Sequence, residues 1–341
     1  MKRLFSLALA LLLLTGCALP AAESTPTIYE ASFLELFDTL TVVKGAAESQ
    51  EAFEEISRTV HDELKYYHQL FDVYNSYENL NNLKTVNDRA GQEPVVVDEA
   101  IIALLKDCSS YYELTGGKVN VAMGAVLKLW HDARTAGIED PLHAALPDMA
   151  KLQAAAAHSD FSCVVIDEAA STVFITDPKI QLDVGAVAKG WAAQRVAEKM
   201  PANILLSVGG NVCATGPKTA DTPWVIGVQN PAGGDPQYLH TLYVTGGSYV
   251  TSGDYQRAYM VDGKIYHHII DPDTLYPSRY WRSVTVLCAD SGLADALSTA
   301  LFLLPLEEGQ ALLEKAGAEA MWVDAAGERF YSPGFEKSIK N

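Results

Sequence analysis

Two short segments in the second half of the chain carry the side chains best suited to chemistry. Residues 251–257 read TSGDYQR and residues 266–272 read YHHIIDP, so together they supply hydroxyls, two carboxylates, a guanidinium and two imidazoles. The residues between them include the turn-forming sequence Val-Asp-Gly-Lys at 261–264. Asp-Gly between two strand-like runs favours a hairpin. The sequence therefore predicts a hairpin that presents a reactive rim.

A second motif, residues 182–191 (LDVGAVAKGW), combines an acid, a glycine turn and a helix that begins with small residues. Such a turn lets a phosphate approach the backbone N–H groups at a helix N-terminus, with Lys189 placed to neutralise it. The segment is neither a Walker loop nor a GxGxxG fingerprint. Close packing of a strand on a helix, with an exposed lysine, is the alternative interpretation.

A third motif, residues 294–301 (ADALSTAL), places Asp295 and Thr299 four residues apart, so that both side chains share one face of a helix. A carboxylate and a hydroxyl are hard oxygen ligands, which suit Mg²⁺ better than zinc. An acid favoured by the helix dipole beside a back-bonding threonine is the alternative. The three motifs together indicate metal-assisted chemistry on a phosphate ester or anhydride.

The elements that must position these motifs change in type along the chain. Apolar periodicity predicts helices over 50–71 and 99–114, and later over 186–199, 293–304 and 307–316. Short β-branched runs predict strands at 163–166, 172–175, 204–208, 224–228, 239–244 and 284–287. We therefore expect an α+β protein with a mixed sheet. Residues 141–147 are the best candidate for an internal loop between two halves.

The motifs taken together resemble those of the ApbE family of FAD:protein FMN transferases. The matching segments are 183–190, the Gly-Gly-Asn turn at 209–211, TSGDYxR at 251–257, HIIDP at 268–272 and ADALxTA at 294–300. Phe37-Asp38-Thr39 stands where the family usually has Met-Gly/Asp-Thr. The resemblance implies two intimately packed α/β halves with a mixed, largely antiparallel sheet and an FAD cleft between them. A flavin transferase domain over 33–341 follows, with possible internal halves near residue 150.

The resemblance also implies roles for individual residues. The carbonyl of Ala186, with Asp295 and Thr299, would hold Mg²⁺. The residues implied as FAD contacts are Phe37, Tyr74, Lys118, Val119, Asn120, Asp183, Lys189 and Ile269. Two departures from the family pattern stand out: Gly-Lys-Val-Asn at 117–120 replaces Gly-x-Phe-Asp, and Leu275 replaces a glycine. Leucine adopts a positive φ less easily than glycine, so we expect the loop backbone to differ at that point.

The reaction implied is Mg²⁺-dependent transfer of FMN from FAD to a Ser or Thr hydroxyl of an exported acceptor protein, with release of AMP. An alcohol needs a general base, and His268 is the candidate because an imidazole titrates near the working pH. His267 is assigned a packing or orienting part; adjacent histidines on a surface strand are the alternative for both. Two other functions stay open: an Mg²⁺-dependent FAD pyrophosphatase giving FMN and AMP, and a non-catalytic flavin-binding lipoprotein.

The N-terminus indicates where the protein works. Residues 1–16 have the basic start and short apolar run of a signal peptide, and Leu-Thr-Gly-Cys at 14–17 resembles a bacterial lipobox. We expect lipidation at Cys17, a lipidated tether over 17–32 and attachment to the extracytoplasmic face of the cell membrane. The formal net charge of −18 argues against nucleic acid as a partner. The sequence assigns no disulfide among Cys108, Cys163, Cys213 and Cys288.

Overall fold

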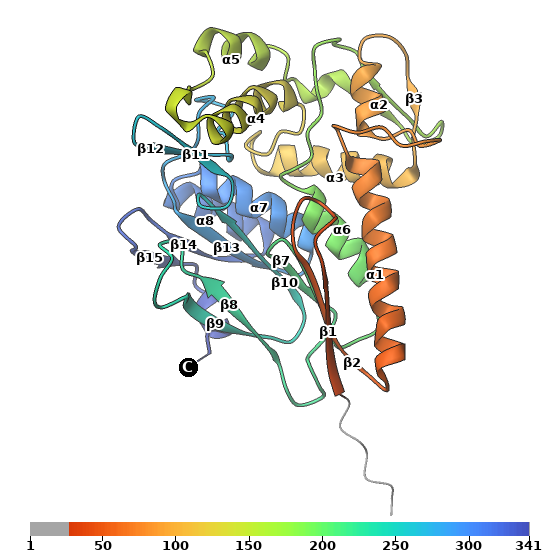
Figure 1. The fold of residues 1–341 in the computed structure, drawn as a ribbon, viewed down its shortest axis with the longest axis vertical. Helices are drawn as coiled ribbons and strands as arrows, with labels where there is room; N and C mark the ends of the chain where they lie inside the picture. The colour runs from red at the N-terminus through yellow and green to blue at the C-terminus, as the bar shows by residue number, and fades with distance from the viewer. Residues whose placement is uncertain (1–26, 341) are drawn as a thin grey trace, which may run out of the picture.

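Eight strands form the central sheet of the protein, whose computed structural model describes residues 27–340 (Figure 1). Neighbouring strands in the sheet follow the order β1–β2–β6–β7–β10–β13–β14–β15. Their bounds are β1 Thr27–Phe33, β2 Thr41–Ala47, β6 Ile204–Val208, β7 Asn211–Ala214, β10 Gly247–Gly253, β13 Ser283–Cys288, β14 Glu319–Val323 and β15 Arg329–Tyr331. Every neighbouring pair is antiparallel. The α+β class is confirmed, and this sheet is antiparallel throughout where a mixed, largely antiparallel one was expected.

Three smaller sheets complete the strand content of the described residues. Their strands are β3 Val95–Val96, β5 Thr172–Ile175 and β4 Val164–Asp167; β8 Trp224–Gln229 and β9 Tyr238–Val244; and β11 Ala258–Val261 and β12 Lys264–His267. The predicted hairpin is confirmed as β11–β12, which turns at Asp262 and Gly263 with φ of 48° and 74°. Residues 251–253 belong instead to β10 of the central sheet.

The helices cover one face of the central sheet and one end of the molecule (Figure 1). Their bounds are α1 Gln50–Phe71, α2 Leu83–Asp88, α3 Glu99–Leu114, α4 Gly124–Glu139, α5 Met149–Ala156, α6 Ala188–Ala197, α7 Ser291–Leu303 and α8 Leu306–Ala316, with 3-10 turns η1 Pro141–His143, η2 Phe161–Cys163 and η3 Phe335–Ser338. The predicted helices 50–71 and 99–114 are confirmed to the residue. Side chains cap both, because the Ser49 hydroxyl accepts the Ala52 N–H and the Asp98 carboxylate accepts the Ala100 N–H.

Helix α7 is the most deeply buried helix of the site region. It packs on α6, β10 and β13, and most of its residues are buried. Alternation along β10 sends Ser252 toward α7, where its hydroxyl lies 2.8 Å from that of Ser298, while Tyr249 packs in the cluster under β8–β9. The Asp290 carboxylate caps the helix by accepting the Leu293 N–H at 2.8 Å. This packing fixes where the polar residues of α7 emerge.

A second apolar cluster joins α4 and α5 to the β11–β12 hairpin. Its buried side chains are Met123, Val126, Trp130, Leu152, Tyr259, Val261, Tyr266, Ile270 and Leu275. Residues 141–147, expected as a loop between halves, hold η1 and lead into α5, which packs back on α4. Strands β3 and β5 pair across this segment, so residues before and after it share one layer.

The N-terminal predictions fall mainly outside the described residues. The signal segment 1–16, Cys17 and most of the tether lie in residues 1–26. Residues 27–32, assigned to the tether from their position, form part of β1 and pair with β2. Within residues 27–340, no helix is both long and apolar enough to cross a membrane.

Candidate active site

The carboxylate of Asp295 is the meeting point of three elements. Asp295 is 4% exposed, and its Oδ2 accepts the Gly190 N–H of α6 at 2.9 Å and the Asn211 amide of β7 at 2.8 Å. The Lys189 ammonium lies 3.4 Å from the same oxygen. These hydrogen bonds fix the orientation of the buried carboxylate. The motifs at 183–190, 209–211 and 294–300 are thus brought together.

The carbonyl of Ala186 is left free beside this carboxylate. The Gly190 N–H, four residues further on, would bond to Ala186 in a regular helix, but it donates to Asp295 instead. In the part of the chain that the structure describes, no backbone N–H donates to the Ala186 carbonyl. The Lys189 ammonium also lies 3.4 Å from the Gly185 carbonyl, so a positive charge already stands between this turn and Asp295. The donor set is one that a hard cation fits.

Thr299 lies one turn after Asp295 on α7, as the i, i+4 spacing predicted. It is half-buried. Residues 27–340 contain no group of three His, Cys, Asp or Glu side chains that could hold a metal. A metal bound here would therefore depend on one carboxylate supplemented by neutral oxygens. That set suits Mg²⁺ and excludes the nitrogen and sulfur ligands typical of zinc.

Gly190 makes the close approach of α6 and α7 possible. A Cβ built on it would lie 2.2 Å from the Ser291 carbonyl oxygen and 2.5 Å from the Asp295 Cβ. Both distances are far inside van der Waals contact. The glycine of the 182–191 motif is therefore needed for helix packing, as the structural alternative proposed. The alternative interpretation also expected an exposed lysine. Lys189 is not fully exposed, because its ammonium points to Asp295.

Asp183 closes the turn that precedes α6. Its N–H donates to the Val121 carbonyl at 2.8 Å, and its Oδ1 accepts the Gly185 N–H at 2.8 Å. Burial raises the pKa of this carboxyl above its ordinary value, and the Gly185 N–H opposes the rise. The Gly185 N–H is therefore already bonded to the Asp183 carboxylate, so a ligand phosphate would have to share or displace that bond.

The two adjacent histidines have different environments. His267 is buried; its Nδ1 accepts the Ile269 N–H at 3.2 Å, so its Nε2 donates to the Ser278 carbonyl at 2.7 Å. This geometry fits the orienting part expected for it. His268 is partly exposed, and its Nδ1 is buried without a hydrogen-bond partner in the described residues.

The titration expected for His268 is not found. Burial, and then the charges of Arg257, His267, Arg134 and Lys189, lower the pKa of His268 to about 3. The sequence analysis expected an imidazole that titrates near the working pH. The pKa falls because the fold buries His268 and, as a smaller effect, places it near charged residues from other parts of the chain, which sequence proximity does not reveal.

Sequence reasoning missed a polar group on α4. The Arg134 Nη2 lies 3.1 Å from the His131 Nδ1, and the His131 ring packs at 5.4 Å, tilted by 31°, against Tyr74, which is 55% exposed. Burial and then Arg257 lower the pKa of Arg134. His131 and Arg134 are three residues apart, a spacing that would place both on one face of a helix, but helix 124–139 was not predicted.

The sequence profile of the ApbE family matches residues 34–322. The chain belongs to the ApbE family. It is 36% identical over 260 residues to the FAD:protein FMN transferase of Treponema pallidum, covering 71% of this chain and 70% of that protein. It is 32% identical to the protein of the same name from Klebsiella pneumoniae, covering 75% and 81%.

Solved ApbE structures share the fold. The Thermotoga maritima ApbE protein aligns with a TM-score of 0.82 and 29% identity, covering 92% of this chain and all of that one. The Vibrio cholerae flavin transferase ApbE aligns with a TM-score of 0.77 and 22% identity, covering 92% and 100%. The family assignment made from five short motifs is thereby confirmed.

Three other positions implied by the resemblance, Val119, Asn120 and Ile269, differ in burial and in their contacts. Val119 and Ile269 are buried at 2% and 6% exposure. The Asn120 amide donates to the Ser159 carbonyl and its Oδ1 accepts the Ala122 N–H, so this departure from the family aspartate serves the local fold. Their predicted flavin contacts would therefore involve backbone atoms more readily than these side chains.

Lys118 and Phe37 are held by protein contacts as well. The Lys118 ammonium bonds to Asp271 at 2.9 Å and Asp273 at 2.7 Å; burial lowers its pKa, but these two bonds outweigh burial and raise it. Phe37 has a φ of 54°, and its N–H donates to the His68 Nδ1 at 3.2 Å. Both residues thus tie loops to the body of the domain.

Leu275 adopts a left-handed backbone conformation, with a φ of 60°, although leucine takes up such a φ less easily than glycine. The Leu275 N–H donates to the Asp271 carbonyl at 2.8 Å, the Trp130 indole donates to the Leu275 carbonyl at 2.9 Å, and the side chain is buried. Packing and two hydrogen bonds offset the cost of the left-handed conformation, which is about 1–2 kcal/mol for a residue with a Cβ.

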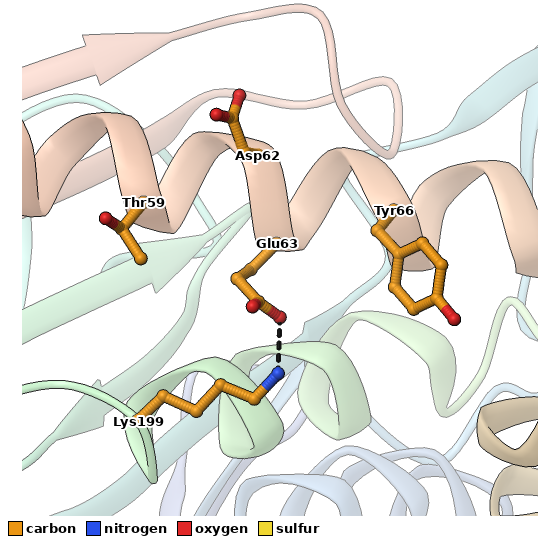
Figure 2. Close-up of a pocket in the computed structure, with 5 residues that line it drawn as sticks. All are labelled: Thr59, Asp62, Glu63, Tyr66 and Lys199. Atoms are coloured by element: carbon orange, nitrogen blue, oxygen red, sulfur yellow. Dashed lines mark hydrogen bonds and ion pairs between the residues drawn. The ribbon is translucent and has the colours of Figure 1, made fainter.

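Two cavities lie outside the Asp295 centre. One of about 450 Å³ opens between α1 and α6, lined by Thr59, Asp62, Glu63, Tyr66 and Lys199. Figure 2 shows Lys199 already paired with Glu63, at 2.6 Å. The other, of about 210 Å³, lies under β8–β9 and reaches Gly210 and Thr251. Gly210 adjoins Asn211, so only the second cavity borders the candidate site.

Proposed function

We propose that this protein is an FAD:protein FMN transferase, which uses Mg²⁺ to move FMN from FAD to a Ser or Thr hydroxyl of an exported acceptor and releases AMP. The observation that carries the proposal is the Asp295 carboxylate, fixed by three donors next to a free Ala186 carbonyl. Its setting in an ApbE-family chain supports it, as do the names of the relatives from Treponema and Klebsiella.

Three oxygens of this chain would hold the metal: the Ala186 carbonyl, the Asp295 carboxylate and the Thr299 hydroxyl. Bound Mg²⁺ supplies Lewis acidity to a pyrophosphate and stabilises charge on the leaving phosphate. The Lys189 ammonium lies beside Asp295 and would neutralise a second negative oxygen of the pyrophosphate. Asn211 and the Gly190 N–H keep the carboxylate from turning away.

The reaction exchanges one phosphorus–oxygen bond for another. The acceptor hydroxyl oxygen forms a bond to the FMN-side phosphorus of FAD, the bond from that phosphorus to the bridging oxygen breaks, and AMP leaves with the bridging oxygen. The hydroxyl proton passes to a base. His268 is neutral in the free protein and so has an acceptor nitrogen available, and the two negative charges of bound FAD would raise its pKa by offsetting the nearby cations.

Location forms part of the same proposal. Lipidation of Cys17 would hold the domain at the extracytoplasmic face of the membrane, where an exported acceptor is found. The lipobox-like Leu-Thr-Gly-Cys supports this. Replacing Cys17 by Ser should release the protein from the membrane fraction, and full retention of that variant would contradict the anchor.

A mass measurement tests the reaction. The chain without residues 1–17 is incubated with FAD and Mg²⁺, with and without an acceptor domain, and the acceptor is examined for the mass of an FMN adduct. Free FMN and AMP with no adduct would identify a pyrophosphatase, and tight FAD binding without turnover would identify a flavin carrier. Either result contradicts the transferase.

The metal has its own test. Asp295→Ala removes the one carboxylate of the donor set, so transfer should fall about 100-fold or more and Mg²⁺ should no longer restore it. Thermal unfolding with and without Mg²⁺ gives a readout that is independent of turnover, since a bound ion stabilises the folded state. An Asp295→Ala protein with unchanged activity and unchanged Mg²⁺ dependence would refute the assignment.

A further inference from the structure

Strand β8 has an open edge beside the cavity of about 210 Å³ that lies under the β8–β9 hairpin. Within residues 27–340, β9 is the only strand that pairs with β8. The outer edge of β9 is covered by the chain's own C-terminal segment, since the Lys340 N–H donates to the Thr241 carbonyl at 2.7 Å. The two-stranded sheet is thus closed on one side and open on the other.

The register shows which backbone groups this open edge presents. The Thr241 carbonyl faces the C-terminal segment, so Thr241 and its partner Gly227 form a pair that is not hydrogen-bonded across β8–β9. The N–H and carbonyl of Gly227 therefore point away from β9, as do those of Val225 two residues earlier. In the part of the chain that the structure describes, no backbone group outside β8–β9 bonds to either residue. Such edge groups are a template for an added strand.

The cavity beside this edge is small and has a neutral lining. Its side chains bear hydroxyls, an amide, aromatic rings or aliphatic groups, and no charged side chain of residues 27–340 lines it. Its volume of about 210 Å³ lies below the range of about 300–1,000 Å³ that is typical of small-molecule pockets. A dinucleotide with two negative charges therefore fits neither the size nor the lining. An extended peptide with small uncharged side chains fits both.

Alternation along the strands connects the cavity with the Asp295 centre. Gly210 lines the cavity, and the side chain of the next residue, Asn211, bonds to Asp295. Thr251 lines the cavity in the same way, while the Ser252 side chain turns to α7 on the other face of the sheet. Apart from its chain neighbours, no described atom lies within 4 Å of where a Cβ on Gly210 would be. A peptide in the cavity can therefore pass this end of the sheet toward Asp295.

Arg282 fixes the width of the cavity mouth. Its Nε donates to the Asp254 Oδ2 at 2.8 Å, and its Nη2 donates to the Pro231 carbonyl at 2.8 Å. Pro231 lies in the loop that joins β8 to β9, and Asp254 directly precedes Tyr255, which lines the cavity. One guanidinium thus joins the end of the hairpin to the turn after β10. A binding edge that is held in place beforehand loses less conformational freedom when a partner binds.

We propose that the open edge of β8 binds an extended, uncharged segment of the acceptor protein as an added strand, whose small side chains enter the cavity and whose hydroxyl residue reaches past Gly210 toward the Asp295 centre. This inference rests on the proposed function and names the surface that recognises its protein substrate. Main-chain hydrogen bonds to Val225 and Gly227 supply affinity, and the small neutral cavity selects against bulky or charged side chains.

Hydrogen exchange tests the docking without turnover. When an acceptor domain is added in the absence of FAD, amides within residues 224–229 should exchange more slowly, because the N–H groups of the open edge gain carbonyl partners. Amides of β4, an edge strand of a different sheet, are the internal control and should not change. Unchanged exchange at 224–229 with a saturating concentration of the acceptor domain would overturn the proposal.

Two substitutions test the edge and the cavity separately. Val225→Pro removes one N–H of the open edge, and an edge strand tolerates proline where the N–H faces outward. The KM for the acceptor should rise about 2–10-fold, the loss of one hydrogen bond, while FAD affinity stays the same. Ile226→Phe keeps every edge N–H but fills the cavity, so the same KM should rise about 10-fold or more.

Val225→Ala is the matched control, because it trims the same exposed side chain and keeps the N–H. Its KM for the acceptor should equal that of the unchanged protein. An unchanged KM in both Val225→Pro and Ile226→Phe would contradict the docking site. A parallel loss of FAD affinity in both variants would also contradict it, because it would mean a general disturbance of the fold.

The outcomes separate this inference from the proposed function. Slower exchange at 224–229 in the presence of an acceptor domain that never gains an FMN adduct would support the docking edge and refute the transferase. An adduct formed on an acceptor that leaves exchange at 224–229 unchanged would refute the docking edge alone.

Discussion

The Asn211 amide lies 2.8 Å from the Asp295 Oδ2, and this bond ties the turn between β6 and β7 to helix α7. Asn211 is 2% exposed, and no sequence motif for metal binding would include it as a ligand. It acts on Asp295, the residue proposed to contact the metal, and so is a positioning residue. Such partners of a ligand orient it and tune its affinity for the ion.

Asn211→Ala should weaken Mg²⁺ binding by about 10–100-fold, because the carboxylate loses the donor that orients it. Folding stability should also fall by about 1–3 kcal/mol, since a charged acceptor loses a buried partner. Mg²⁺ titrations followed by thermal shift measure the first effect, and urea unfolding measures the second. Asn81→Ala, which removes an exposed amide bonded to Val96, is the control. Unchanged Mg²⁺ affinity in Asn211→Ala would contradict the positioning role.

Gly190→Ala should destabilise the fold and misplace Asp295. The added Cβ would lie 2.2 Å from the Ser291 carbonyl oxygen, so α6 and α7 must move apart. Overpacking of this kind costs about 1–3 kcal/mol, to be measured by chemical unfolding. Gly216→Ala is the control, because the new Cβ there would meet its nearest atom at 3.5 Å and the backbone φ is not positive. Equal stability of the two variants would refute the packing argument.

The His268 pKa predicts how stability changes with pH. The folded protein holds this pKa at about 3, whereas an unfolded histidine titrates near ~6.5. Between these values the unfolded chain binds a proton that the folded chain does not. Stability should therefore fall as pH drops from about 6.5 toward 3. His268→Gln should lose less stability over this interval, as measured by urea unfolding at pH 7 and pH 4.5.

The same depressed pKa bears on the rate profile. Since kcat/KM reports the free enzyme, it should contain no ionisation of His268 between pH 5 and 8. His268→Gln should reduce transfer while leaving FAD binding within about 2-fold, because the base acts on the acceptor hydroxyl. A kcat/KM step in that interval that disappears in His268→Gln would contradict the structure.

Leu275 offers a comparison of two substitutions at a positive φ. Leu275→Ala and Leu275→Gly both lose the buried side chain, but only alanine keeps the cost of the left-handed backbone. The glycine variant should therefore be the more stable of the two by about 1 kcal/mol. Inside a helix or strand the alanine variant is normally the more stable of the two, because glycine loses more conformational entropy on folding. Paired unfolding curves decide the matter, and a more stable alanine variant would contradict it.

The sequence predicted those elements whose signal is local. Helices 50–71 and 99–114 have a regular apolar stripe and a capping residue, and the later strands are β-branched runs between turns. Strands β1 and β2 were not predicted. Most of β1 was assigned to the tether, and these strands form through long-range pairing, since β1 pairs with β2 and β2 pairs with β6 much later in the chain. Helix α4 was missed because its buried face is defined by β11 and β12.

The site shows the same division. Asp295, Thr299 and Lys189 could be named because spacing on a helix and residue type suffice. The neutrality of His268 could not be predicted, because it depends first on burial and then on the charges of residues such as Arg257, which only the fold brings about. The free Ala186 carbonyl could not be predicted from the sequence either. It is free because the Gly190 N–H donates to Asp295, a side chain of another helix.

Strand β1 enters at the end of the molecule farthest from α4 and β11, and it runs seven residues before the loop that carries Phe37 (Figure 1). Seven strand residues span about 23 Å. With the proposed lipid on Cys17, residues 17–26 add at most ~35 Å of reach. The proposed anchor would therefore attach to the end of the molecule opposite α4 and the β11–β12 hairpin, and the length of the tether would limit how far from the bilayer the domain can reach an acceptor hydroxyl.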